Sequence, residues 1–151
     1  MNEDHLFQVF LNMSLTNREE VYRFVSQQIF PNDEMKQEKI ITEFAIREDL
    51  GNLKIAEHTL LPHIESNLLS ESRIVVIQLA DEIAQWSIQT QNIRLLIFVL
   101  LKDGEAQNVK YSIASFMRNL AREEFIEQLL RMSDVKQFFS TLSQEHLNKK
   151  R

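Results

Sequence analysis

Apolar and polar positions in the first third of the chain follow the period of an α-helix. Two segments carry apolar residues at helical spacing, first Val21, Phe24, Val25 and Ile29, then Met35, Ile40, Ile41, Phe44 and Ala45. Thr16 and Glu19 match a capping box at the start of the first helix, with Thr16 as the cap. Residues 31–33 separate the two helices, and the second is expected to end near residues 48–51.

The apolar pattern changes after Gly51. Residues 59–61 form a short extended stretch that should end at Pro62, because proline lacks the backbone N–H that a central strand needs. Residues 73–79 and 93–101 are apolar on successive positions and rich in β-branched side chains. Such continuous apolar strands are typical of a sheet covered on both faces. This part of the chain therefore predicts three or four strands of a small central sheet.

Helical spacing returns after Gly104. Three further apolar stripes follow, made of Ile113, Phe116, Met117 and Leu120, of Phe125, Ile126, Leu129 and Leu130, and of Val135, Phe138, Phe139 and Leu142. Ser133 is the expected cap of the last helix. The order of two helices, three or four strands and three helices predicts a single α/β domain over residues 1–151. Its small central mixed sheet should be sandwiched between helices.

Composition removes several classes of function. The 151 residues include no cysteine, which excludes disulfides, thiolate zinc sites and cysteine nucleophiles. Two glycines are too few for a glycine-rich phosphate loop, and a net charge of −5 argues against a nucleic-acid groove. The sequence shows neither a secretory signal nor an apolar run long enough to span a bilayer. We therefore expect a cytoplasmic protein without direct nucleic-acid binding or membrane insertion.

The pair Pro62-His63 is the best candidate for chemistry. A histidine can carry a proton, a metal ion or a phosphoryl group. The five-residue spacing of His58 and His63 suits a metal pair neither on a helix nor on a strand, and no Gly-x-Ser-x-Gly nucleophile motif is present. Phosphoryl transfer through His63 remains, with Arg47, Lys54 and His58 as candidate donors to the phosphoryl oxygens. The alternative is a structural histidine hydrogen-bonded to the backbone.

The same residues occur in an order that resembles the enzyme IIA domain of the fructose/mannitol class of the bacterial phosphotransferase system. The resemblance covers residues 15–142, and the ordered set of motifs is more specific than any one of them. It rests on Arg47-Glu48, a loop with Gly51, Leu60-Leu61-Pro62-His63, Trp86 between the two long strands, and the late helices that begin with residues 121–125.

The resemblance implies a function for two residues. In that family the histidine matching His63 accepts a phosphoryl group from the phosphocarrier protein and passes it to an enzyme IIB, and the arginine matching Arg47 lies beside it. It therefore implies a phosphohistidine carrier for sugar transport or its regulation that needs neither cofactor nor metal. The implied partners are the phosphocarrier protein and an enzyme IIB or a regulator domain, and a homodimer is compatible with it.

The chain departs from the family pattern in two places. Residues 53–58, before the Pro-His pair, lack the family's glycines, and His58 is an added histidine there. A second family histidine is missing after the last long strand, where Lys110 or Asn108 is a substitute donor. Similar departures occur in enzyme IIA-like domains of transcription regulators, in which phosphorylation acts as a switch. A second hypothesis follows, a non-catalytic interaction or regulatory module that keeps the fold.

Overall fold

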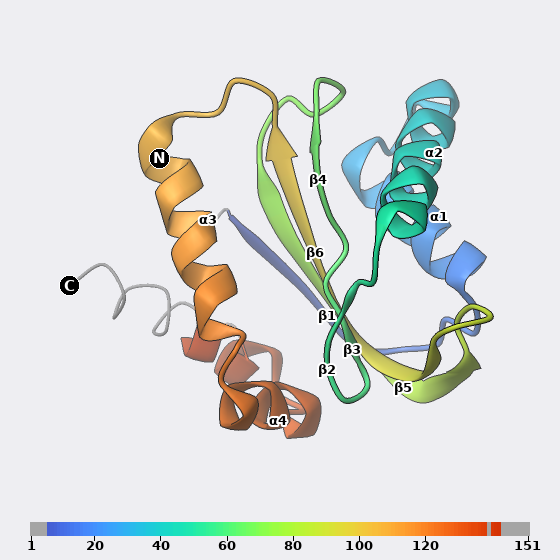
Figure 1. Ribbon diagram of the computed structural model, residues 1–151, viewed down its shortest axis with the longest axis vertical. Coiled ribbons are helices and arrows are strands. Elements are labelled where there is room, and N and C mark those ends of the chain that lie inside the picture. The colour runs from blue at the N-terminus through green and yellow to red at the C-terminus, as the bar shows by residue number, and fades with distance from the viewer. Residues whose placement is uncertain (1–5, 139, 143–151) are drawn as a thin grey trace.

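The computed structural model describes residues 6–138 and 140–142, and it contains a six-stranded mixed sheet with helices on both faces (Figure 1). Its elements are β1 (Phe7–Met13), α1 (Arg18–Ile29), α2 (Glu34–Leu50), β2 (Lys54–Ala56), β3 (Thr59–Leu60), β4 (His63–Ser66), β5 (Arg73–Gln85), β6 (Gln91–Lys102), α3 (Gln107–Asn119) and α4 (Glu123–Arg131). Residues 135–138 and 140–142 are also helical. The predicted fold class is confirmed. Within the described residues, no helix combines the length and apolar content that a membrane span requires.

The strand order is β1-β5-β6-β3-β2, and β4 pairs with β6 beyond the end of β3. Strands β3 and β4 both run parallel to β6, with Thr59 opposite Leu95 and His63 opposite Val99. Pro62 lies between these two short strands. It cannot donate to the ladder, but its carbonyl accepts a hydrogen bond from the Val99 N–H at 2.9 Å. The chain therefore stays beside β6 through the break, and β4 begins at His63.

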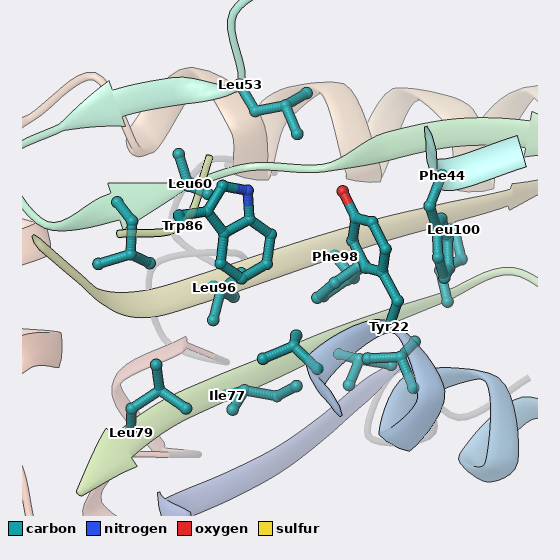
Figure 2. Close-up of a cluster of buried hydrophobic side chains, with 14 of the residues drawn as sticks. Tyr22, Phe44, Leu53, Leu60, Ile77, Leu79, Trp86, Leu96, Phe98 and Leu100 are labelled. Atoms are coloured by element: carbon teal, nitrogen blue, oxygen red, sulfur yellow. The ribbon is translucent and has the colours of Figure 1, made fainter. Parts of the chain in front are cut away.

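Each face of the sheet has its own core. In Figure 1, α1 and α2 cover one face, and α3 and α4 cover the other. Neighbouring residues of β5 divide between the two, because Val75 and Ile77 belong to the cluster under α1 and α2, whereas Ile74 and Val76 belong to the other. Figure 2 shows the first cluster, in which aromatic side chains of helices and strands pack together. Burial on both faces explains the unbroken apolar sequence of the two long strands.

The first strand, β1, is absent from the elements that the sequence predicts. It pairs in parallel with β5, where Phe7 lies opposite Ile74 and Phe10 opposite Ile77. Its odd-numbered residues from Phe7 to Met13 are all apolar, which is a period-two signal, but the apolar Phe10 interrupts it. The correct order therefore begins with a strand, and the predicted set of two helices, strands and further helices follows it.

Both predicted caps are shifted by one residue. Asn17 caps α1, since its side-chain oxygen accepts the Glu20 N–H at 2.8 Å. The Glu20 carboxylate accepts from the N–H of Thr16 at 2.7 Å and from the Thr16 hydroxyl at 2.9 Å, and these two hydrogen bonds hold the pKa of Glu20 below the usual value. Asp134, not Ser133, caps the last helix, with its carboxylate accepting from Gln137 N at 3.1 Å. The predicted core residue Phe139 lies outside the described residues.

Candidate functional site

His63 is the first residue of β4 and lies half-buried at an edge of the sheet. In the described part of the chain β4 pairs with β6 alone, so its other side has no strand beside it. The local cause is the Pro62 break, after which the strand resumes and positions His63 level with Val99. A side chain at such an edge can be reached by a second protein.

A backbone contact favours one tautomer of the neutral His63 ring. Its Nδ1 lies 3.4 Å from the carbonyl oxygen of Leu61. A carbonyl only accepts hydrogen bonds, so this contact favours the neutral ring with its proton on Nδ1 and its lone pair on Nε2. The alternative interpretation of His63, as a purely structural histidine, also predicts a hydrogen bond to the backbone. The same bond leaves the ring with a nucleophilic nitrogen at Nε2, so one contact serves both interpretations.

An open hollow of about 330 Å³ lies between α2 and β4. Its lining residues are Glu43, Ile46, Arg47 and Leu50 from α2 and His63, Ile64 and Glu65 from β4. The α2 residues follow a spacing of three, four and seven, so they share one face of the helix. The fold thus brings Arg47 and His63 together at one hollow. Arg47 is half-buried, and its Nη1 lies 3.5 Å from the carbonyl oxygen of Gly51.

The hollow has a mixed electrostatic character. Arg47 is its cation, whereas Glu43 and Glu65 contribute carboxylates. The Glu43 carboxylate accepts a hydrogen bond from Ser66 Oγ at 3.1 Å, which ties α2 to β4. Its rim is apolar and solvent-accessible, since Ile46 is 55% and the neighbouring Leu50 is 78% exposed. An exposed apolar rim around a charged centre is typical of a surface that docks another protein.

His58 and Lys110, the two predicted accessory residues, do not line this hollow. His58 lies in the turn between β2 and β3 with φ of 63°, and its Nδ1 is 2.9 Å from Glu82 Oε2 and 2.8 Å from the Asn92 carbonyl oxygen. The register places His58 five residues before His63 along the same side of β6, roughly 16 Å away. Their accessory roles stay predictions.

Lys110 lies in the first turn of α3 and acts on a nearby carboxyl group. Burial alone would raise the pKa of Glu105. Hydrogen bonds from Ser72 and from the Ala106 N–H, together with the charges of Lys102 and Lys110, outweigh burial and bring that pKa below its usual value. Lys54, another candidate donor to the phosphoryl oxygens, forms an ion pair of 3.9 Å with the carboxylate of Glu57.

The residue whose role the sequence did not reveal is Glu48, immediately after Arg47. Its side chain is 15% exposed. Tyr22 donates its hydroxyl to Oε1 at 2.5 Å, Trp86 donates Nε1 to Oε2 at 2.7 Å, and Arg18 Nη1 lies 3.5 Å from Oε1. In Figure 2 the Tyr22 hydroxyl and the Trp86 nitrogen lie on the same side of the cluster, away from the labelled β5 side chains. Burial raises the pKa of the Tyr22 phenol, and the bond to Glu48 adds to the shift.

A sequence signal for Glu48 was present. The buried side chains of α2 are those of Gln37, Ile40 and Phe44. Glu48 continues that stripe one turn after Phe44, so a carboxylate occupies a position where the pattern expects an apolar side chain. A carboxylate on a buried stripe needs donors. The pattern does not say that they come from α1 and from the β5–β6 turn.

Comparison with known protein families places this geometry in context. Residues 6–145 match the family model described as phosphoenolpyruvate-dependent sugar phosphotransferase system, EIIA 2. The chain belongs to this EIIA family. The match covers nearly the whole chain and includes both sides of the hollow and the Glu48 cluster. The family that the Arg-Glu and Pro-His motifs resemble is thereby confirmed, and the chain is an EIIA-like domain of the phosphotransferase system.

Solved structures of EIIA domains share the fold. The nitrogen regulatory protein IIA-Ntr from Neisseria meningitidis has a TM-score of 0.75 at 10% identity, covering 92% of this chain and 97% of its own. The mannitol IIA from Escherichia coli has a TM-score of 0.64 at 18% identity, with coverages of 94% and 98%. A complex of Escherichia coli enzyme IIAMtl with phosphorylated enzyme IIBMtl gives 0.62 at 19%, with 91% and 99%. No curated protein matched the sequence.

Proposed function

We propose that His63 accepts a phosphoryl group on Nε2 and passes it on, as the phosphohistidine of a sugar phosphotransferase relay. The observation that carries the proposal is the shared hollow, in which Arg47 and His63 meet at an open sheet edge in a chain of the EIIA family. Nucleophilic transfer through histidine needs an accessible ring nitrogen and a cation for the phosphoryl oxygens. His63 and Arg47 supply these two requirements.

The transfer itself balances without a cofactor. The lone pair on Nε2 of His63 attacks the phosphorus of a donor phosphoimidazole, and the new N–P bond forms as the old one breaks. The bonding pair of the broken bond returns to the donor's ring nitrogen. The acceptor ring becomes cationic, and its Nδ1–H faces the Leu61 carbonyl, which stabilises that charge. Arg47 needs to release the Gly51 carbonyl, a contact of 3.5 Å, to bind the phosphoryl oxygens.

The phosphocarrier protein is the proposed donor, and an enzyme IIB is the proposed acceptor. The acceptor is supported by the solved complex of a related IIA with a phosphorylated IIB. The exposed apolar side chains of Ile46 and Leu50 beside the hollow give either partner a surface to cover. Covering the hollow would also exclude water, which protects a phosphohistidine from hydrolysis.

Labelling tests the proposal directly. The chain is incubated with phosphoenolpyruvate, enzyme I and phosphocarrier protein, and its intact mass is measured beside a known EIIA domain as control. We expect the wild type and His58→Ala to gain one phosphoryl group, and His63→Ala to gain none. The proposal is wrong if the control is labelled and the wild type is not, or if His63→Ala is labelled as well as the wild type.

A second candidate is an interaction module that kept the fold and lost the relay. It is favoured by the carboxylates of Glu43 and Glu65, which share the hollow with Arg47 and would repel a phosphoryl group of about −1.5 to −2 charge. The similarity in fold to a nitrogen regulatory IIA is compatible with such a role. This candidate predicts no labelling by the phosphocarrier. It also predicts that an unphosphorylated partner binds the wild type and is lost with Leu50→Asp at the exposed rim.

A further inference from the structure

We propose that Glu48 is a positioning residue, which holds Arg47 at the His63 hollow through the end of α2. The inference rests on the proposed function of His63. Glu48 does not line the hollow, and it follows Arg47 directly in sequence. Its carboxylate instead accepts from Tyr22 of α1 and from Trp86 of the β5–β6 turn, with Arg18 as a third contact.

Helix geometry links the two residues. Consecutive residues of an α-helix point in directions about 100° apart, so Arg47 and Glu48 face different sides of the last turn. Arg47 faces the hollow with His63, and Glu48 faces the cluster shown in Figure 2. Because both side chains leave the same turn, fixing the rotation of the helix through Glu48 also fixes the direction from which Arg47 enters the hollow.

On the side that faces the His63 hollow, few interactions in the described part of the chain hold the last turn of α2 in place. The helix ends at Leu50, which is exposed, and Gly51 follows as its C-cap. The contact of Arg47 with the Gly51 carbonyl is long, at 3.5 Å. The hydrogen bonds from Tyr22 and Trp86 to Glu48, at 2.5 and 2.7 Å, are therefore the shortest polar ties that the described residues show between this turn and the rest of the fold. Hydrogen bonds to a half-buried carboxylate are charge-assisted and strong.

The two closest donors to Glu48, Tyr22 and Trp86, suit a positioning role because they come from separate parts of the fold. Tyr22 is buried in contact with Phe44 and Phe98, at ring distances of 5.2 and 6.1 Å. Trp86 is also buried, and its ring lies 5.7 Å from that of Tyr22 in an edge-on arrangement. Buried side chains from α1 and from the β5–β6 turn thus hold one carboxylate in place, as a precisely placed site residue requires of its neighbours.

A double-mutant cycle separates positioning from general support. The rate of phosphoryl transfer from the phosphocarrier protein is measured for the wild type, Glu48→Gln, Arg47→Ala and the double variant. We expect Glu48→Gln to slow transfer about tenfold when Arg47 is present and less than about twofold in the Arg47→Ala background. An equal loss in both backgrounds overturns the proposal, because Glu48 would then act without Arg47.

Glu38→Gln provides the matched control on the same helix. Glu38 also ties α2 to α1, through a 2.6 Å ion pair with Arg23, but it lies away from the hollow. Its loss should leave the transfer rate and its dependence on Arg47 unchanged. A loss of rate like that of Glu48→Gln would show that any weakening of the α1–α2 contact is enough, and the specific role of Glu48 would be wrong.

Hydrogen exchange on the unphosphorylated protein distinguishes the failure of this inference from that of the proposed function. We expect faster amide exchange at residues 47–51 in Glu48→Gln than in Glu38→Gln or the wild type. Unchanged exchange overturns the positioning role even if the wild type is labelled. If exchange is faster in Glu48→Gln but the wild type is never labelled, the positioning role of Glu48 stands and the phosphoryl relay is refuted instead.

Discussion

The two sides of the last turn of α2 differ in how firmly their side chains are held, although Glu48 also borders an open hollow, of about 500 Å³. On one side, Glu48 meets three donors within a buried aromatic cluster. On the other side, Arg47 faces an open hollow with exposed apolar neighbours and one long contact to the backbone. The comparison shows how one helix end can provide both rigidity and access. Residues that must exchange partners stay loosely held, and the packed side locates them.

The largest difference in stability should appear when a buried side chain on the packed side is truncated. Phe44 is 1% exposed and packs against both Tyr22 and Phe98. Phe44→Ala should lower the free energy of unfolding by about 3–5 kcal/mol, because it leaves a cavity in the core. The matched change on the open side, Ile46→Ala, should cost less than about 1 kcal/mol. Urea denaturation of both variants measures the contrast, and equal losses would contradict it.

The second difference concerns activity, in which the open side of the turn should matter more than the packed side. Arg47→Ala should change the free energy of unfolding by less than about 1 kcal/mol, because the hydrogen bond of its side chain to the Gly51 carbonyl is long, at 3.5 Å. The same substitution should slow phosphorylation of His63 about a hundredfold, as expected when one positioned donor to a developing anion is lost. Stopped-flow or quenched transfer assays measure this rate. A variant that is destabilised but transfers at the normal rate would show that Arg47 belongs to the packed side.

A third, smaller effect depends on pH and belongs to the packed side. Burial raises the pKa of the Tyr22 phenol above its usual value of 10.0, and the hydrogen bond to Glu48 adds to the shift. The folded protein therefore retains this proton after the unfolded chain has lost it. The stability from Tyr22 is complete below pH 10 and should fall above it by about 1.4 kcal/mol per pH unit.

Tyr22→Phe isolates that contribution. It removes the hydroxyl but keeps most of the ring contacts, so it should cost about 1–2 kcal/mol near pH 7. The difference in unfolding free energy between wild type and variant should shrink as the pH rises above 10. Tyr111 is exposed and is present in both proteins, so it cancels in the comparison. A constant difference across this range would mean that Tyr22 ionises in the folded protein as it does in the unfolded chain.

The smallest effect should arise at the rim of the hollow. Leu50 is 78% exposed, so Leu50→Ser should change the free energy of unfolding by no more than about 0.5 kcal/mol. If a partner covers the rim, the same variant should raise the phosphocarrier concentration needed for half-maximal transfer rate while the limiting rate of transfer changes little. Single-turnover labelling at varied phosphocarrier concentration measures both quantities. A loss confined to the limiting rate would place Leu50 in the transfer step instead of the docking surface.

The local pattern of apolar residues was enough to predict the longer elements, whether they bury one face, as the helices do, or both faces, as the long strands do. It predicts both early helices, the two long strands and the end of the short extended stretch before Pro62, but not that a new strand, β4, begins at His63. It misses β1, whose pairing with β5 joins segments far apart in the chain. Its caps are wrong by one residue, because Thr16 and Asn17 are both good caps and only the backbone geometry decides between them.

The candidate site also has parts that the sequence could predict and parts that it could not. The meeting of Arg47 and His63 at one hollow was predictable only through the ordered family motifs, since nothing local in either residue's surroundings points to the other. The pattern could identify Glu48 as a carboxylate on a buried stripe. Its donors, Tyr22 and Trp86, depend on how α1 and the β5–β6 turn pack against α2, which is a property of the tertiary structure.

The central claim is that Nε2 of His63 carries the phosphoryl group, with Nδ1 facing the Leu61 carbonyl. Nitrogen and phosphorus NMR of the histidine-labelled protein, recorded during phosphorylation by phosphoenolpyruvate, enzyme I and the phosphocarrier protein, tests it most directly. The account predicts one phosphorylated ring, that of His63, with the N–P bond at Nε2 and the proton retained at Nδ1. A phosphoryl group on Nδ1, on another residue or on none at all would contradict it.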